Sequence, residues 1–141
     1  MYGIEDFPLT GMGMNAFRKV MPVLYPTFLS DPSVDIAHAH NQLLQVALDL
    51  GLPGLVGYVA LWMGSLGAAV ICIRNRQNEA VRVLGSALAC GLMAHFFFGI
   101  GDAVALGAKA GIFYWFTLGL LVALLRVWRP VRSPTVEQAA G

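Results

Sequence analysis

Two neighbouring polar residues, His40 and Asn41, begin a pattern whose residue types could carry chemistry. Nine residues separate Asn41 from Gly51, two more separate Gly51 from Gly54, and a long apolar segment follows. An imidazole accepts a proton near neutral pH, or holds a phosphate oxygen when it is charged. Beside a membrane, such a group could act on lipid-borne substrates, so His40 is the candidate catalytic residue. The alternative is that His40 and Asn41 only supply polar groups where an interfacial helix begins.

Other polar residues are candidates for binding a substrate. His95 lies inside an apolar segment, where an ionisable side chain is expensive and by default indicates function. Asp102 follows it by seven residues, so a continuous helix would place both on one face. Arg18 and Lys109 could each hold an anionic group. The candidate binding residues are therefore Asn41, Arg18, His95, Asp102 and Lys109.

Each of these residues also has a structural interpretation. Asp102 could cap a helix end, Lys109 could snorkel to the membrane interface, and Arg18 could be a solvated loop charge. His38 precedes His40 by two positions, so on a helix it would point to nearly the opposite face. We therefore expect His38 to be a supporting or surface residue.

Three apolar segments must position these residues. Of the 141 residues, 57% are hydrophobic and only 12% are charged, where soluble domains average about 25% charged residues. Segments 55–73 and 83–101 each run nineteen residues without Asp, Glu, Lys or Arg, close to the ~20 that cross a bilayer. A third segment, 112–125, is shorter. The sequence predicts an all-α integral membrane protein with three transmembrane helices within residues 53–129.

The distribution of arginines predicts the orientation of these spans. Arginines stand at 74, 76 and 82 between the first two apolar segments, and at 126, 129 and 132 after the third. Short loops rich in Lys and Arg stay on the cytoplasmic side of a membrane. We therefore expect the first 52 residues and the Asp102 loop to face outward, and residues 130–141 to form a cytoplasmic tail.

Two segments precede the spans. Residues 1–37 are dense in Pro and Gly, which predicts an irregular external loop segment with room for a short helix over 15–24. Residues 38–52 alternate Leu and Ala with Gln42, Gln45 and Asp49 at helical spacing. A helix of twelve residues is only about 18 Å long, too short to span a membrane. We expect a short amphipathic helix that lies at the outer interface.

The end of this interfacial helix has its own signals. Gly51 suits the left-handed position at which a helix stops, and Pro53 suits the first turn of the next helix. Gly54 lacks a side chain and so permits a close helix approach. We expect these three residues to be structural, fixing how His40 faces the spans.

Composition argues against several classes of function. The net charge is +1, so the chain lacks the basic surface that nucleic acid requires. Cys72 and Cys90 are isolated within apolar stretches and are expected to behave as small hydrophobes. No metal-binding or cofactor motif stands out, and we expect neither a metal nor a cofactor.

The chain resembles the O-antigen ligase and polymerase superfamily of bacterial membrane glycosyltransferases. The resemblance rests on the pattern His-Asn-x9-Gly-x2-Gly, which His40, Asn41, Gly51 and Gly54 match without a gap. A second element, Pro-Leu-Thr-Gly-Met-Gly-Met-Asn-Ala-Phe at 8–17, resembles the family's Pro-x2-Gly-x-Gly-x3-Phe segment. The span order and orientation also agree.

This resemblance implies transfer of a glycan from an undecaprenyl-pyrophosphate carrier to a sugar hydroxyl of lipid A-core or another glycan acceptor. The reaction would occur at the periplasmic face of the bacterial inner membrane, among membrane lipids and without a metal. His40 would be the family's essential histidine, placed near the pyrophosphate or the incoming hydroxyl. The departing pyrophosphate needs charge stabilisation and the hydroxyl must lose its proton, and an imidazole suits both needs.

One departure from the family pattern limits the expected activity. Family members have about a dozen spans and an arginine-bearing stretch just upstream of the Pro-x2-Gly segment, whereas seven residues without arginine precede Pro8 here. We expect a C-terminal portion that is inactive without the missing N-terminal spans. Two alternatives remain open: an O-antigen polymerase, or a transporter-like or structural membrane protein of the same superfamily.

Overall fold

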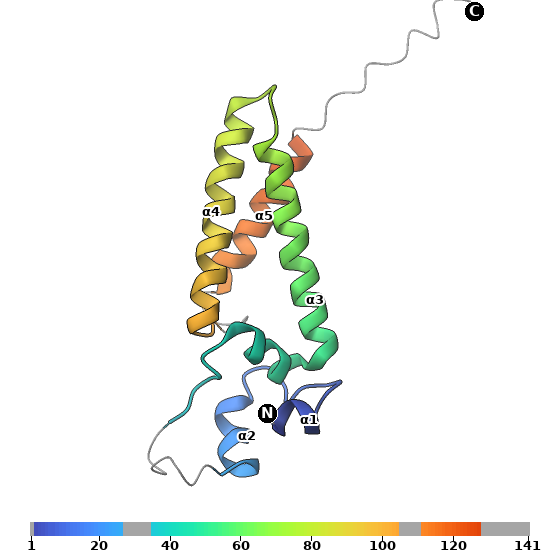
Figure 1. Ribbon diagram of the computed structural model, residues 1–141, viewed down its shortest axis with the longest axis vertical. Helices are drawn as coiled ribbons and strands as arrows, with labels where there is room; N and C mark the ends of the chain where they lie inside the picture. Colours follow the sequence, from blue (N-terminus) through green and yellow to red (C-terminus); the bar gives the residue numbers. More distant parts are fainter. Residues whose placement is uncertain (1, 27–34, 105–110, 128–141) are drawn as a thin grey trace, which may run out of the picture.

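The computed structural model describes residues 2–26, 35–104 and 111–127, and these residues are helical with connecting loops. The helices are α1 (Tyr2–Asp6), α2 (Phe17–Leu24), α3 (Gln42–Ile73), α4 (Glu79–Gly101) and α5 (Gly111–Val127). Figure 1 shows α3, α4 and α5 packed together as a bundle, with α1 and α2 gathered at one end of it. The predicted all-α class is confirmed for the described residues.

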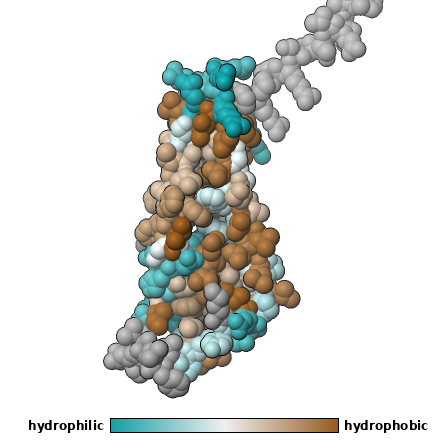
Figure 2. Space-filling model, in the orientation of Figure 1, coloured by the Kyte–Doolittle hydropathy of each residue, from teal (hydrophilic) through white to brown (hydrophobic). Residues whose placement is uncertain are grey.

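The long helices have the character of membrane spans. By length and composition α3 and α4 could each cross a membrane, while α5 is an apolar helix of 17 residues. Large apolar side chains such as Val56, Phe97 and Phe113 point outward from the bundle. Figure 2 shows this apolar surface along the bundle and a hydrophilic cap at one end. That cap is the α3–α4 turn, where Arg74 and Arg76 are exposed.

A sharp bend divides α3 into two parts. Gly51 has φ 71° and ψ −175°, a backbone conformation that an L side chain rarely adopts, and Pro53 follows two residues later. This confirms the predicted helix stop at Gly51 and restart at Pro53. Gly54 is expected to permit the close approach of another helix, but the nearest atoms belong to α3 itself: a Cβ there would lie 2.2 Å from Cβ of Leu50.

The loop that follows Pro8 packs into this bend. Backbone N–H groups of Met12 and Gly13 donate to the carbonyls of Leu48 and Asp49, at 2.6 and 3.1 Å. These carbonyls have lost their helical partners because the helix stops, so the loop acts as their cap. In the opposite direction, the N–H of Leu52 donates to the carbonyl of Pro8 at 2.7 Å.

Glycines make this close packing possible. A Cβ on Gly51 would lie 2.6 Å from the backbone carbon of Leu9, and a Cβ on Gly11 would lie 2.5 Å from that of Asp49. The two sequence patterns, 8–17 and 40–54, are therefore the two sides of one backbone joint. We call residues 8–13 and 48–54 the hinge joint.

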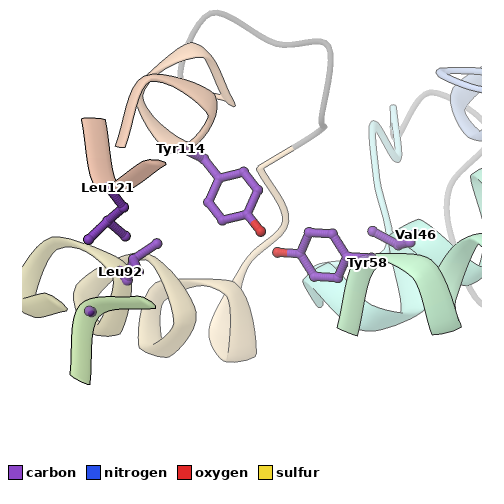
Figure 3. Packing of buried hydrophobic residues seen from close by; sticks show 6 residues of the cluster. Val46, Tyr58, Leu92, Tyr114 and Leu121 are labelled. Atoms are coloured by element: carbon purple, nitrogen blue, oxygen red, sulfur yellow. The ribbon is translucent and has the colours of Figure 1, made fainter. Parts of the chain in front are cut away.

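Packing inside the bundle depends on side-chain size. A cluster of buried residues joins α3, α4 and α5, among them Val46, Tyr58, Leu92, Tyr114 and Leu121 (Figure 3). Where α3 crosses α4, Gly85 leaves room for Cys72, since a Cβ on Gly85 would lie 2.4 Å from the cysteine Cβ.

The segment ahead of α3 is more ordered than the sequence predicts. The short helix expected over 15–24 is present as α2, whereas α1 was not anticipated. Phe17 at the start of α2 is buried and shares an apolar pocket with Leu44 and Leu48 of α3. Residues 8–17 thus reach α3 both through the hinge joint and through this aromatic side chain.

Candidate functional site

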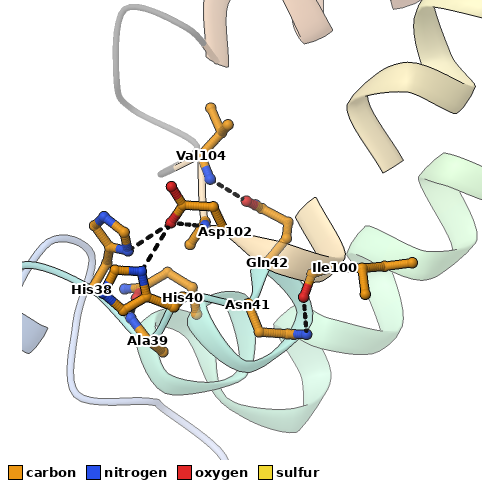
Figure 4. A network of polar contacts seen from close by, with 10 residues as sticks. His38, Ala39, His40, Asn41, Gln42, Ile100, Asp102 and Val104 are labelled. Carbon is orange, nitrogen blue, oxygen red and sulfur yellow. Dashed lines mark hydrogen bonds and ion pairs between the residues drawn. The ribbon is translucent and has the colours of Figure 1, made fainter. Parts of the chain in front are cut away.

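Three ionisable side chains meet where α4 ends and α3 begins. Nδ1 of His40 lies 3.2 Å from Oδ1 of Asp102 and forms a hydrogen bond with it, and Nδ1 of His38 lies 3.3 Å from the same oxygen. The two imidazole rings have their centroids 4.4 Å apart. Figure 4 shows both rings turned toward the single carboxylate.

The two histidines come together because α3 begins later than predicted. Its first residue is Gln42, and Asn41 is the N-cap, with extended backbone and a side-chain oxygen that accepts the N–H of Leu44 at 3.1 Å. His40 has φ 48°, in the left-handed region, so the chain turns sharply there. The expectation that His38 and His40 point to opposite faces of a helix is therefore wrong, because neither is helical.

The end of α4 is fixed by the same short segment. The side-chain amide of Asn41 donates to the carbonyl of Ile100 at 3.2 Å, and Oε1 of Gln42 accepts the N–H of Val104 at 2.7 Å. Both bonds hold the backbone on either side of Asp102, as Figure 4 shows. The first two polar residues of the α3 segment therefore position the carboxylate that faces His40.

His95 and Asp102 do not share a helix face, contrary to the expectation from their spacing. The helix stops at Gly101, and Asp102 has extended backbone with φ −152°. His95 instead stacks on Tyr114 of α5, with ring centroids 4.9 Å apart. The structure thus places Asp102 with the histidines of the loop, and His95 within the bundle.

The polar face of the first part of α3 is buried rather than exposed. Gln42, Gln45 and Asp49 are each less than 7% exposed. Oε1 of Gln45 accepts the N–H of Ala39 at 2.9 Å, and its amide donates to Asp49 at 2.9 Å. The predicted amphipathic pattern is present, but its polar face is covered by loops of the protein and forms hydrogen bonds with them.

The electrostatics favour an ionised Asp102. The N–H of Ala103 donates to Oδ1 at 2.8 Å and is the main reason why the pKa of Asp102 lies below its ordinary value. Burial opposes this effect, whereas the charges of His38 and His40 and the hydrogen bond from His40 lower the pKa further. A carboxylate in this position favours the imidazole tautomer with the proton on Nδ1, which leaves Nε2 of His40 as an acceptor.

Two imidazoles and a carboxylate are also ligand types that metals accept. One ligand atom from each of His38, His40 and Asp102 lies within 4.8 Å of the others. However, Oδ1 of Asp102 already accepts hydrogen bonds from Ala103 and His40. We therefore interpret the cluster as a hydrogen-bonded histidine–aspartate pair with a second histidine beside it.

The remaining predicted binding residues are not part of the His38, His40 and Asp102 cluster. The guanidinium of Arg18 pairs with the carboxylate of Asp35, with Nε 2.8 Å from Oδ1, and both side chains are more than half exposed. The side chain of Asn41 caps the start of α3 and donates a hydrogen bond to the carbonyl of Ile100 at the end of α4. Lys109 lies outside the described residues, as do the arginines at 129 and 132.

These features define a class: a helical protein with apolar, span-like helices and a histidine–aspartate pair at one end of them. Residues 3–59 match the family model described as O-Antigen ligase, which confirms the resemblance seen in the motifs. The matched segment holds the hinge joint and His40. Asp102 lies beyond it. No curated protein and no solved structure matches the chain.

Sequence reasoning missed the partnership of His38 and His40 with Asp102. One signal was available: Asn41 is a preferred N-cap residue directly before Gln42, which favours a helix start after His40. The contact across 62 residues had no comparable local signal.

Proposed function

We propose that this chain carries the catalytic histidine of an O-antigen ligase-like glycosyltransferase. The enzyme would move a glycan from undecaprenyl pyrophosphate to a sugar hydroxyl of lipid A-core or another acceptor. The observation that supports this most directly is the hydrogen bond from His40 to Asp102, since His40 belongs to the motif of the family-matched segment.

His40 is suited to act as the general base. Its side chain is 68% exposed, so an acceptor sugar can approach it. As the hydroxyl oxygen forms its bond to the anomeric carbon, its proton passes to Nε2 of His40. The bond between that carbon and the pyrophosphate oxygen breaks, and the pyrophosphate leaves with the electron pair.

Asp102 and His38 have supporting roles in this proposal. The imidazolium that forms on His40 lies 3.2 Å from the Asp102 carboxylate, which stabilises the positive charge. His38, 29% exposed, is placed beside the same carboxylate. When protonated, it offers a cation to the departing pyrophosphate.

The location of the site supports an extracytoplasmic reaction. The His40–Asp102 pair lies where α3 begins and α4 ends. Figure 1 shows the arginine-bearing α3–α4 turn at the opposite end of the bundle. Under the positive-inside rule that turn is cytoplasmic, so the pair faces the periplasm. We further propose that activity requires additional spans, because three helices leave His40 largely open to solvent.

The test is replacement of His40 by alanine in cells that produce this protein. We expect glycan transfer to fall by about 10²–10⁴-fold, the usual contribution of a general base. Gln77→Ala, at the exposed turn on the opposite end of the bundle, is the matched control and should leave transfer unchanged.

The products distinguish the possible functions. Loss of a ligase should accumulate long glycans on the lipid carrier, whereas loss of a polymerase should leave single repeats attached to the acceptor. Unchanged surface glycan with His40→Ala protein present in the membrane would reject both enzymatic functions. The transporter-like or structural alternative would then be favoured.

A further inference from the structure

A small cavity lies between α3 and α4 within the bundle. Its walls include the polar side chains of Gln42, Tyr58 and His95, with Phe96 and Ile100 among the apolar ones. The space open to the centre of a water-sized sphere is about 20 Å³. That is enough for one water molecule, which needs roughly 10–15 Å³ by this measure.

Polar atoms around the cavity lack hydrogen-bond partners among the described residues. They are Nε2 of Gln42 and Nε2 of His95, both on residues that line the cavity. The hydroxyl of Tyr114, which lies outside the lining, also lacks a partner among the described residues. Gln42 is only 4% exposed and Tyr114 only 3%. A buried polar group without a partner is costly, so native proteins usually satisfy such groups with protein or with ordered water.

The unpartnered groups converge from three helices. Figure 3 shows the hydroxyls of Tyr58 on α3 and Tyr114 on α5 directed toward one another, and their rings are 5.9 Å apart. His95 of α4 stacks on the Tyr114 ring. Gln42, Tyr58 and His95 therefore line one small space, and the hydroxyl of Tyr114 is directed toward that of Tyr58.

We propose that this cavity binds an ordered water molecule. The water accepts a hydrogen bond from the amide of Gln42 and donates one to Nε2 of His95, and the hydroxyl of Tyr58, which also lines the cavity, supplies a further partner. Such a site meets both conditions for buried water, sufficient room and two to four polar partners. Because Oε1 of Gln42 holds the N–H of Val104, the water connects α4 to the loop that follows Asp102.

The most direct test measures water contact at His95 in the full chain. Protein labelled at histidine and tryptophan is placed in lipid bilayers, and transfer of magnetisation from water to each side chain is followed by solid-state NMR. The His95 signal is assigned by its loss in His95→Phe. Exposed His40 is the wet reference. Trp62 is the dry reference, because its indole N–H is buried with no partner among the described residues and does not line this cavity.

We expect His95 to receive water magnetisation several-fold faster than Trp62 and at a rate approaching that of His40. A rate at His95 as slow as that at Trp62 would show a dry cavity and overturn the proposal.

Thermal unfolding in detergent gives an independent result. In a hydrated cavity, His95→Phe removes a hydrogen-bond partner of the water and should lower the unfolding midpoint by roughly 2–6 °C. In a dry cavity the same change removes an unpaired polar atom and should raise the midpoint. An increase would therefore also contradict the proposal.

Discussion

The two ends of α3 are stabilised in different ways. Beyond Gly51, α3 packs against α4 and α5 through apolar residues that fit together. For example, Cys72 occupies the space that the missing side chain of Gly85 leaves. Before Gly51, buried polar side chains such as Gln45 also form hydrogen bonds with the backbone of adjoining loops. The first arrangement tolerates many apolar sequences, whereas the second requires particular donors and acceptors.

This difference explains where the candidate site lies. An apolar bundle supplies rigid helices but few groups that can exchange protons. The polar end supplies those groups and fixes them, since Asn41 and Gln42 hold the backbone around Asp102. The candidate site therefore lies at the end of the molecule whose geometry depends on individual hydrogen bonds.

Matched glycine substitutions should show the largest difference in stability between the two parts of α3. Gly51→Ala places a Cβ against the backbone of Leu9 and forces a left-handed alanine, so we expect it to lower the free energy of unfolding by about 2–4 kcal/mol. Gly64 on the same helix has open space around it. Gly64→Ala should be neutral or stabilising by up to about 1 kcal/mol.

Denaturant unfolding in detergent checks both variants. Equal effects of Gly51→Ala and Gly64→Ala would mean that the hinge joint does not constrain the backbone as described.

Two N-cap asparagines provide a finer comparison. Asn78 caps α4 by accepting the N–H of Val81, and Asn78→Ala should cost about 1 kcal/mol. Asn41 caps α3 and also donates to the carbonyl of Ile100. Asn41→Ala should therefore cost about 1 kcal/mol more.

The same two variants should differ in activity, since only Asn41 holds the end of α4 beside Asp102. We expect reduced glycan transfer in Asn41→Ala and unchanged transfer in Asn78→Ala. Similar activity in the two variants would argue against a role for Asn41 in positioning Asp102.

The smallest of these effects should be the pH dependence of stability that Asp102 contributes. The pKa of Asp102 is lower in the folded protein than its ordinary value, so its stabilising contribution is complete above that ordinary pKa, about 4. The contribution is lost as the pH falls through the lower folded pKa. The Asp102→Asn variant should lose less stability than the unaltered protein between about pH 5 and pH 3. Parallel stability profiles would contradict this assignment.

The sequence predicts the bundle well and the site only in part. Long uncharged runs predict α3 and α4, and the need for a left-handed residue predicts the stop at Gly51. Its residue type and motif identify His40 as a candidate. They do not predict its left-handed backbone conformation, with φ 48°, because that conformation depends on the surrounding loops. Burial of Gln42, Gln45 and Asp49 was also not predicted, since their partners come from distant loops.

The most direct test of the His40–Asp102 pair is a double-mutant cycle on glycan transfer. The rates of His40→Ala, Asp102→Asn and the double variant are compared with that of the unaltered protein at equal amounts in the membrane. If Asp102 acts by orienting His40, Asp102→Asn should slow the protein that retains His40 and leave the rate of His40→Ala unchanged. Multiplied losses in the double variant would show that the two residues act independently and would contradict the proposed pair.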